Sequence, residues 1–231
     1  VAKSICALAV HILADRGLVK LDAPVATYWP EFGQSGKDDI LVRHVQGHQC
    51  GAVFSDTAKP GDWFNYSAQC SAIARQEPAW PPETKGGYNT INIGFILGEI
   101  VRHVTGKTIG TFIREEISEP LGAEYNIGLT TKELDLVAPM HLNPENNFWA
   151  ECAREGSNLN RAHSGRPDNP NLLNCIEIRK GELPPFGGHG NARGVARIYA
   201  MLANDGELDG VRLLKPDTVE HLSKLQWKGI N

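Results

Sequence analysis

The sequence predicts a helix-rich α/β domain that contains almost none of its own sheet. Convincing strand patterns are scarce among the 231 residues, and the clearest is a short one at 211–214. Helical periodicity is common instead, and the segment 88–105 carries apolar residues nearly all round, which is typical of a buried helix. This pattern fits either an all-α protein or the helical part of an α/β protein whose sheet strands lie outside the given residues.

The individual helices are predicted from their start and stop signals. The first is an amphipathic segment that runs from Ile5 to near Gly17, since glycine commonly terminates a helix. Asp22 and Pro24 are typical of a short helix start, with the aspartate as cap and the proline in the first turn. Residues 139–185 lack periodicity, and irregular stretches of this length are usually functional or mobile. Further helices are expected at 40–48, 67–76, 88–105, 109–117, 190–204 and 216–225.

Composition and charge exclude some classes of protein. Hydrophobic residues make up 41% and charged residues 22% of the chain, as in an ordinary globular protein, and the net charge is −4. Because nucleic-acid binding requires a basic stripe, no nucleic-acid partner is expected. No apolar run is long enough to span a bilayer. The five cysteines are irregularly spaced without a Cys-x-x-Cys pair, which indicates neither a disulfide framework nor a zinc ribbon.

Lys3 is the first candidate functional residue, because a charged side chain is unusual on the first turn of a buried helix. It fits the second half of a Ser-x-x-Lys element whose serine would precede Val1 by one residue. Residues three apart lie on one helical face, so the amine would reach the serine hydroxyl. The alternative is a solvated lysine at a frayed terminus. Ser4 cannot replace this serine, since Ala7 occupies the position three residues after it.

Tyr88 is the second candidate, and it is predicted to open the buried helix after a loop rich in proline and glycine. A tyrosine at a loop-to-helix junction can direct its hydroxyl into a cleft. A neighbouring ammonium makes a phenol easier to ionise, so that it can act as a general base near neutral pH. The alternative is a tyrosine that packs its ring and bonds its hydroxyl to the backbone.

Several segments, taken in order, resemble one known family. Residues 80–101, from Trp80 to Val101, are similar to the tyrosine segment of the serine β-lactamase-related hydrolases. Within that group they are most similar to the family VIII carboxylesterases and the β-lactamase-domain proteins. The other matching segments include the Ser-x-x-Lys helix and an arginine-histidine stretch. They lie at 3–9, 21–30, 42–51, 119–122 and 188–199, so the resemblance covers nearly the whole chain.

The resemblance implies a β-lactamase/transpeptidase-like α/β fold, present here mainly as its helical part with most of the antiparallel sheet missing. Residues 1–231 would form a single incomplete domain that lacks the serine-bearing start and the C-terminal strands. The implied activity is that of a serine hydrolase acting through an acyl-enzyme on an ester, amide or lactam, with an esterase favoured. Lys3 and Tyr88 would be catalytic and His189 substrate-binding. No cofactor is implied, and residues 1–231 alone would be inactive and marginally stable.

Some motifs depart from the family pattern or admit a second interpretation. Tyr88 is followed by Asn89 and Thr90, not by the spacing of the Tyr-x-Asn motif of class C β-lactamases, so efficient lactam turnover is not expected. His189 lies between glycines and either lines the cleft or forms a turn that caps the next helix. The sequence Gly106-Lys107-Thr108 is neither the family's third motif nor a P-loop.

His44 and His48 stand four residues apart with Cys50 nearby, which is a conceivable metal pair on one helix face. The Glu of His-Glu-x-x-His is missing, and the resemblance implies a structural role for this segment, so no metal is expected. Gln49 and Cys50 replace a Thr-Ser pair of the family and have no role that the sequence assigns. Trp63 and Trp149 are interpreted as packing residues, with a pocket wall as the alternative.

Two other functions are compatible with this fold. A non-catalytic binding or scaffold protein would have Ala or Gly in place of the serine before Val1. A D-alanyl-D-alanine peptidase would cleave a D-Ala-D-Ala peptide. The expected partner is a small-molecule ester, amide or lactam, and a homo-oligomer is compatible with the sequence, which indicates neither the substrate itself nor the compartment.

Overall fold

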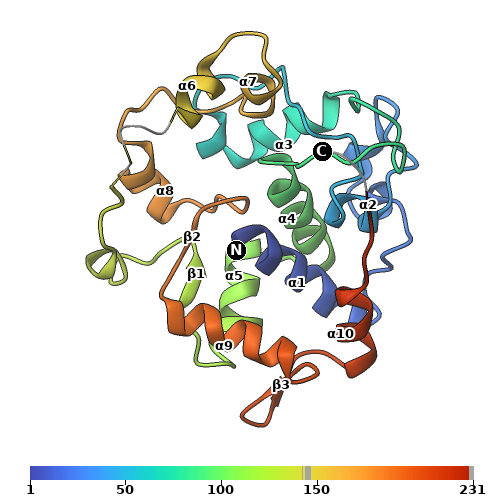
Figure 1. Cartoon of the computed structure of the whole chain (residues 1–231), viewed down its shortest axis with the longest axis vertical. Coiled ribbons are helices and arrows are strands. Elements are labelled where there is room, and N and C mark those ends of the chain that lie inside the picture. The colour runs from blue at the N-terminus through green and yellow to red at the C-terminus, as the bar shows by residue number, and fades with distance from the viewer. Residues whose placement is uncertain (142, 144–146, 229–231) are drawn as a thin grey trace.

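The computed structural model describes residues 1–141, 143 and 147–228, and it is mainly helical (Figure 1). The helix α4 (Asn92–Thr105) is in contact with α1 (Ala2–Asp15), α2 (Val42–Gln46), α3 (Tyr66–Arg75) and α5 (Ile109–Ile113). The other α-helices are α6 (Phe148–Ala153), α7 (Asn158–Ala162), α8 (Ile176–Lys180), α9 (Ala192–Ala203) and α10 (Pro216–Ser223). Shorter 3₁₀ segments are η1 (Val25–Thr27), η2 (Pro30–Gly33), η3 (Asp62–Phe64), η5 (Leu134–Leu136) and η6 (Leu172–Asn174), and η4 (Arg114–Ser118) is a π-helical turn.

The prediction of a buried helix is confirmed, because residues 92–101 of α4 are all buried. The predicted start at Tyr88 is wrong, since the helix begins at Asn92. The Asn89 side-chain oxygen accepts a hydrogen bond from the Ile93 amide at 3.0 Å. Such side-chain bonds offer the backbone an alternative to helical geometry. Tyr88 therefore lies in the loop that leads into α4.

Strands are few in the described residues, as expected. β1 (Tyr125–Ile127) pairs with β2 (Gly188–Gly190), and β3 (Glu207–Leu208) pairs with β4 (Val211–Arg212), both antiparallel. β1 and β2 were not predicted, because strands of three residues are too short to show alternation and two of the β2 residues are glycines.

The structure corrects one interpretation of His189. It lies in β2, opposite Asn126 in β1, and is therefore not a turn residue that caps the next helix. That helix, α9, begins at Ala192 and not at Gly190, and its cap is the Asn191 side chain, which accepts a hydrogen bond from the Gly194 amide.

Other predicted boundaries also change. The stretch 139–185 contains α6, α7, α8 and η6, each too short for its periodicity to be visible in the sequence. The helix predicted at 109–117 becomes α5 followed by the π-helical turn η4. The short helix expected after Asp22 is the 3₁₀ helix η1, whose N-cap is Pro24 and not Asp22, and α10 ends at Ser223.

Helix α1 contacts α4 and α5, and the N-terminus lies near the centre of the view in Figure 1, with Val1 itself exposed to solvent. Residues 8–13 are buried along it, together with Ile5 and Cys6. Cys6 is fully buried, which confirms its interpretation as a core residue. Segments distant in the sequence therefore surround Lys3.

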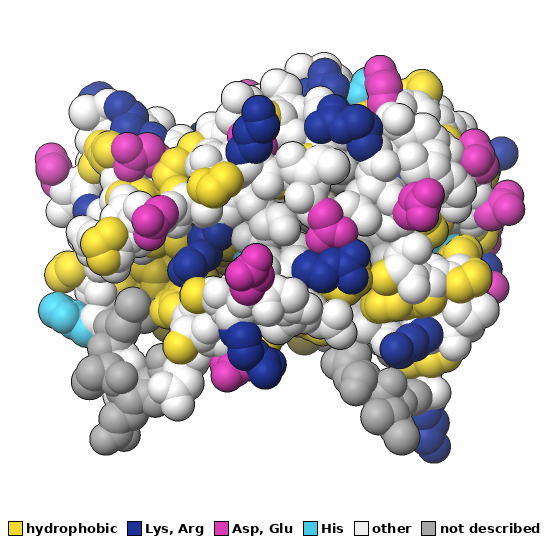
Figure 2. All heavy atoms as spheres, turned by 90° about the horizontal axis from the view of Figure 1, so that it is seen from above, with side chains coloured by type: hydrophobic (Ala, Val, Ile, Leu, Met, Phe, Trp, Pro, Cys, Tyr) yellow, Lys and Arg dark blue, Asp and Glu magenta, His cyan; other side chains and the backbone are white. Residues whose placement is uncertain are grey.

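The surface carries charges of both signs. Lys and Arg side chains are interspersed with Asp and Glu over the face shown in Figure 2. Many of them form ion pairs, such as Arg161 with Asp56 at 2.7 Å and Arg114 with Glu133 at 2.8 Å. Within the described ranges, no helix is both long enough and apolar enough to cross a membrane.

Candidate active site

Lys3 occupies the first turn of α1, and its side chain is turned toward the interior. Its Nζ donates a hydrogen bond to the Pro185 carbonyl at 2.9 Å and lies 5.3 Å from the centroid of the Tyr88 ring. Burial lowers the pKa of the Lys3 ammonium, and the neighbouring Cys6 only partly offsets this effect. A lysine in this environment loses its proton more readily than a solvated one.

Tyr88 approaches Lys3 from the loop before α4. Its side chain is 54% exposed, so one side of the ring faces solvent. The other contact of interest is with His48, whose ring centroid lies 4.8 Å from that of Tyr88 at an interplanar angle of 37°. The structure thus brings Lys3 and Tyr88 together from distant parts of the sequence.

His189 lies in β2, four residues after Pro185, whose carbonyl binds Lys3. Its Nδ1 is 3.0 Å from the Gly187 carbonyl, and burial lowers its pKa. Among the described residues it makes no hydrogen bond to Lys3 or Tyr88. Its role in substrate binding stays a prediction.

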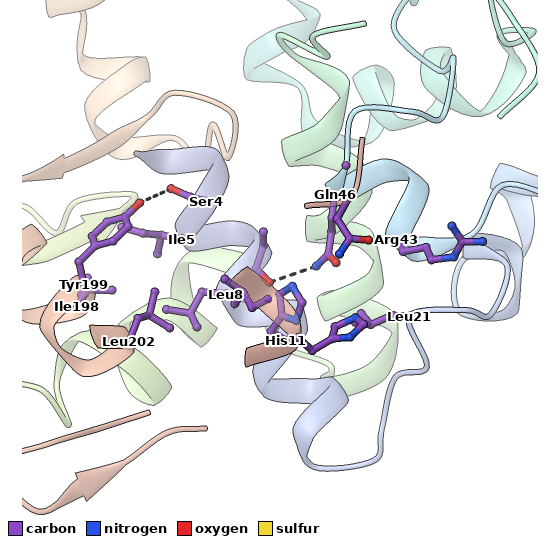
Figure 3. A pocket seen from close by; sticks show the side chains of 15 residues that line it. Ser4, Ile5, Leu8, His11, Leu21, Arg43, Gln46, Ile198, Tyr199 and Leu202 are labelled. Carbon is purple, nitrogen blue, oxygen red and sulfur yellow. Dashed lines mark hydrogen bonds between the residues drawn. The ribbon is translucent and has the colours of Figure 1, made fainter. Parts of the chain in front are cut away.

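Ser4 is oriented toward α9. Its hydroxyl lies 2.6 Å from that of Tyr199 and 2.7 Å from the Val1 carbonyl (Figure 3). Both residues line a cavity of about 210 Å³ between α1, α9 and α10, which is also lined by Leu8 and His11. Ser4 therefore bonds to a group on α9, whereas Lys3 bonds to Pro185.

Helix α2 and the segment after it hold the tyrosine loop in place. The His44 Nδ1 accepts a hydrogen bond from the Leu41 amide at 3.1 Å, and its Nε2 lies 3.1 Å from a Glu83 oxygen. The His48 Nδ1 accepts one from the Asn89 amide. Both ring nitrogens of His44 and the Nδ1 of His48 thus have protein partners. In the ranges described, no group of three or more His, Cys, Asp and Glu residues is arranged to hold a metal ion.

Gln49 and Cys50 acquire a structural role that the sequence did not indicate. The Gln49 carbonyl accepts a hydrogen bond from the Glu83 amide at 3.2 Å. Cys50 is fully buried, and its sulfur accepts a weak hydrogen bond from the Asn89 side chain at 3.8 Å. Both residues therefore join the α2 end to the loop that carries Tyr88.

An aromatic cluster lies next to the Lys3 anchor. Phe186 follows Pro185, and its ring centroid is 5.1 Å from that of Trp63, which is 1% exposed. Trp63 also lies 6.0 Å from the His163 ring and donates from its indole N–H to the Ser164 carbonyl at 3.0 Å. Trp63 packs in this cluster, as interpreted, and it also lines a pocket together with Tyr66 and Leu183.

Comparison with known proteins identifies the class to which this fold belongs. Residues 1–229 match the family model described as Beta-lactamase. The chain belongs to the β-lactamase family, and its fold is the β-lactamase/transpeptidase-like one, represented here mostly by helices and small sheets.

Three relatives illustrate this membership. The esterase/β-lactamase LipL of Mycobacterium tuberculosis is 31% identical over 96% of this chain. The crystal structure of a family VIII carboxylesterase has 33% identity and a TM-score of 0.86 over 96% of the chain. A penicillin-binding protein homologue from Caulobacter crescentus has 33% identity and a TM-score of 0.83 over 99% of it. The chain spans 54%, 59% and 60% of these proteins, respectively.

Proposed function

We propose that this chain is part of a serine hydrolase that acts through an acyl-enzyme, most readily on carboxylic esters. The nucleophile would be a serine directly before Val1 in a longer protein. One observation carries the proposal: the Lys3 ammonium lies 5.3 Å from the centroid of the Tyr88 ring and is held by the Pro185 carbonyl at 2.9 Å. A lysine and a tyrosine in one site are the groups needed to move a serine proton.

The proposed reaction has two steps. The serine oxygen attacks the ester carbonyl while its proton passes to the Lys3–Tyr88 pair, and the pair returns a proton to the departing alcohol as the C–O bond breaks. Water then attacks the acyl carbonyl and gives a proton to the same pair. The pair passes a proton to the serine oxygen as the bond between the acyl carbon and this oxygen breaks, which releases the carboxylic acid and the free serine. The lowered pKa of Lys3 supports this role, because a base must be able to lose its proton at working pH.

The relatives favour an ester as substrate. One bears the name esterase/β-lactamase and another is described as a family VIII carboxylesterase, each at 31% identity or more. Amides and lactams share the acyl-transfer chemistry, but Thr90 stands where class C β-lactamases have the asparagine of their tyrosine motif. We therefore propose small esters as the preferred substrates and lactams as poor ones.

The test uses the longer protein that includes the residue before Val1. A fluorophosphonate probe should add its mass to that serine, and p-nitrophenyl esters of short acids should be hydrolysed. Tyr88→Phe should reduce kcat by about 10²–10⁴-fold, and Tyr28→Phe serves as a control away from the site. Absence of labelling and of hydrolysis would reject the proposal in favour of a non-catalytic binding or scaffold protein.

A second candidate is a D-alanyl-D-alanine peptidase. It is favoured by the 33% identity to the penicillin-binding protein homologue. The two candidates differ in substrate, so parallel assays with a p-nitrophenyl ester and a D-Ala-D-Ala peptide separate them. Faster turnover of the peptide would replace the esterase proposal.

A further inference from the structure

His48 contacts the loop that carries Tyr88 at three consecutive residues. Its carbonyl accepts a hydrogen bond from the Gly87 amide at 3.0 Å. Its Nδ1 accepts one from the Asn89 amide, also at 3.0 Å. Between these two bonds, its ring lies against the ring of Tyr88, with centroids 4.8 Å apart. The tyrosine is therefore held from one side by a single residue.

The backbone of the loop is packed on both sides of Tyr88, but the tyrosine itself is not. A Cβ on Gly87 would stand 2.4 Å from the Trp80 ring, and Asn89 is fully buried. Tyr88, in contrast, is 54% exposed and precedes α4, which begins only at Asn92. A half-exposed tyrosine outside regular structure needs a neighbour to keep its ring in one rotamer.

The backbone of His48 is adapted to these contacts. Its φ is 58°, in the left-handed region that few residues other than glycine adopt. Non-glycine residues there carry a strain of about 1 kcal/mol or more, and such strain is often found at functional sites. In this conformation both the carbonyl and the ring of His48 face the Tyr88 loop.

The protonation state of His48 suits the same purpose. To accept from the Asn89 amide, Nδ1 must be unprotonated, so the ring proton is on Nε2. Burial, and then the positive charge of Lys3, lowers the pKa of His48 to about 4. The ring is therefore neutral at neutral pH and adds no second cation beside Lys3.

We propose that His48 is a positioning residue, which fixes the Tyr88 phenol beside Lys3 through the Asn89 hydrogen bond and the ring contact. The expected effect of His48 on catalysis rests on the proposed function. Its effect on the orientation of the Tyr88 ring does not depend on that function. Two kinds of measurement on the full-length protein therefore test the inference separately.

The variants are chosen to keep the backbone intact. His48→Gly removes the ring and the acceptor but suits a φ of 58°. His48→Asn tolerates the left-handed region and keeps an acceptor near the position of Nδ1. Asp205→Gly is the matched control, because Asp205 also has a positive φ, of 52°, in a turn away from the site.

The first measurement follows the ring of Tyr88 by NMR. The Hα–Hβ couplings of Tyr88 should report one rotamer in the native protein and in Asp205→Gly, and an average over rotamers in His48→Gly. In His48→Asn the Asn89 amide should keep its protection from hydrogen exchange, which His48→Gly should lose. A single Tyr88 rotamer in folded His48→Gly would overturn the inference.

The second measurement is a double-mutant cycle on ester hydrolysis. His48→Gly should lower kcat by about 10-fold to 100-fold with KM changed by less than about twofold, and His48→Asn should recover most of the loss. In a Tyr88→Phe background, His48→Gly should cause no further loss. An equal loss in both backgrounds would mean that His48 acts only on stability and would refute the positioning role. If the native protein shows no hydrolysis while His48→Gly still frees the Tyr88 ring, the proposed function fails and the positioning of Tyr88 stands.

Discussion

Pro185 lies directly against the backbone of Gly94: a Cβ on residue 94 would stand 2.4 Å from the Pro185 nitrogen and 2.6 Å from its Cδ. This close approach lets the Pro185 carbonyl reach the Lys3 ammonium at 2.9 Å. Because Gly94 in α4 has no side chain, it helps to set the position of Lys3 in α1.

Gly94→Ala should consequently destabilise the protein, although alanine inside a helix is normally favoured over glycine by about 1 kcal/mol. The new methyl group would meet backbone atoms that cannot move aside easily, at an expected cost of about 1–3 kcal/mol. Urea denaturation measures this change. Ser71→Ala, on the exposed face of α3, is the control and should be neutral or slightly stabilising. A Gly94→Ala variant as stable as the native protein would show that the backbone around Pro185 can shift to accommodate the methyl group at little cost.

The long helices could be predicted from the sequence because their apolar periodicity extends over many residues. α4 is the clearest case, since its buried stretch 92–101 is nearly all apolar. Lys3 and Tyr88 were identified as candidates because a charge and a phenol stood at unusual positions in helical patterns. Their proximity, in contrast, came from the resemblance and from no local signal.

The supports of the site could not be predicted in the same way. The Pro185 carbonyl is a backbone group, and its contact with Lys3 depends on packing against Gly94. A structural role was expected for the segment that contains His48, but spacing alone does not reveal its φ of 58° or its bond to the Asn89 amide. The start of α4 was misplaced because the Asn89 side chain bonds the Ile93 amide and favours a non-helical backbone before Asn92.

A second prediction concerns Lys37, which is fully buried and forms no part of the site. Its Nζ donates to the Gln34 carbonyl at 2.9 Å, to the Ala74 carbonyl at 2.8 Å and to the Gln76 carbonyl at the end of α3. Lys37→Met keeps the length of the side chain but leaves these carbonyls without a donor, which should cost about 2–4 kcal/mol of unfolding free energy. Chemical denaturation checks this value. Lys132→Met, an exposed control, should change stability by less than about 0.5 kcal/mol.

A third prediction is a loss of stability in mild acid. Burial lowers the pKa of His11 and of His48 to about 4, below the value of about 6.5 expected in the unfolded chain. A base with a lowered pKa in the folded state gives stability that is complete above pH 6.5 and is lost as the pH falls through 4. Each histidine can contribute up to about 3 kcal/mol to this loss.

The measurement is the free energy of unfolding between pH 7 and pH 4. His11→Met should flatten the pH dependence, because a neutral side chain binds no proton in either state. His141→Gln, at an exposed position, is the control and should leave the slope as it is. Glu133, whose pKa is lowered to about 2 chiefly by Arg114, affects the free energy of unfolding at lower pH than the two histidines do. A native protein equally stable at pH 4.5 and pH 7 would contradict the buried neutral state of both histidines.

A fourth prediction follows from the proposed role of Lys3 as a base. Lys3→Arg keeps the positive charge, but a guanidinium does not lose its proton in proteins. Ester hydrolysis by the longer protein should therefore fall by about 10²–10⁴-fold. In the native protein, the rate should rise with pH and level off below the usual range of lysine, because burial lowers the pKa of Lys3. Unchanged activity in Lys3→Arg would show that the positive charge of Lys3 is sufficient and that Lys3 is not the base.

A last prediction concerns residues 1–231 taken alone, which should hydrolyse p-nitrophenyl acetate no faster than buffer does. The proposed base pair is present, but a base without a nucleophile transfers no acyl group. The chain spans only 54–60% of the length of its relatives. Taken alone it should bury a smaller core, so thermal unfolding should be broad and should begin below about 45 °C, the lower end of the usual range for mesophilic domains. Calorimetry and a continuous esterase assay check the two parts. Sharp, cooperative unfolding at high temperature would mean that these helices complete their own core, and hydrolysis above the buffer rate would require a nucleophile within residues 1–231.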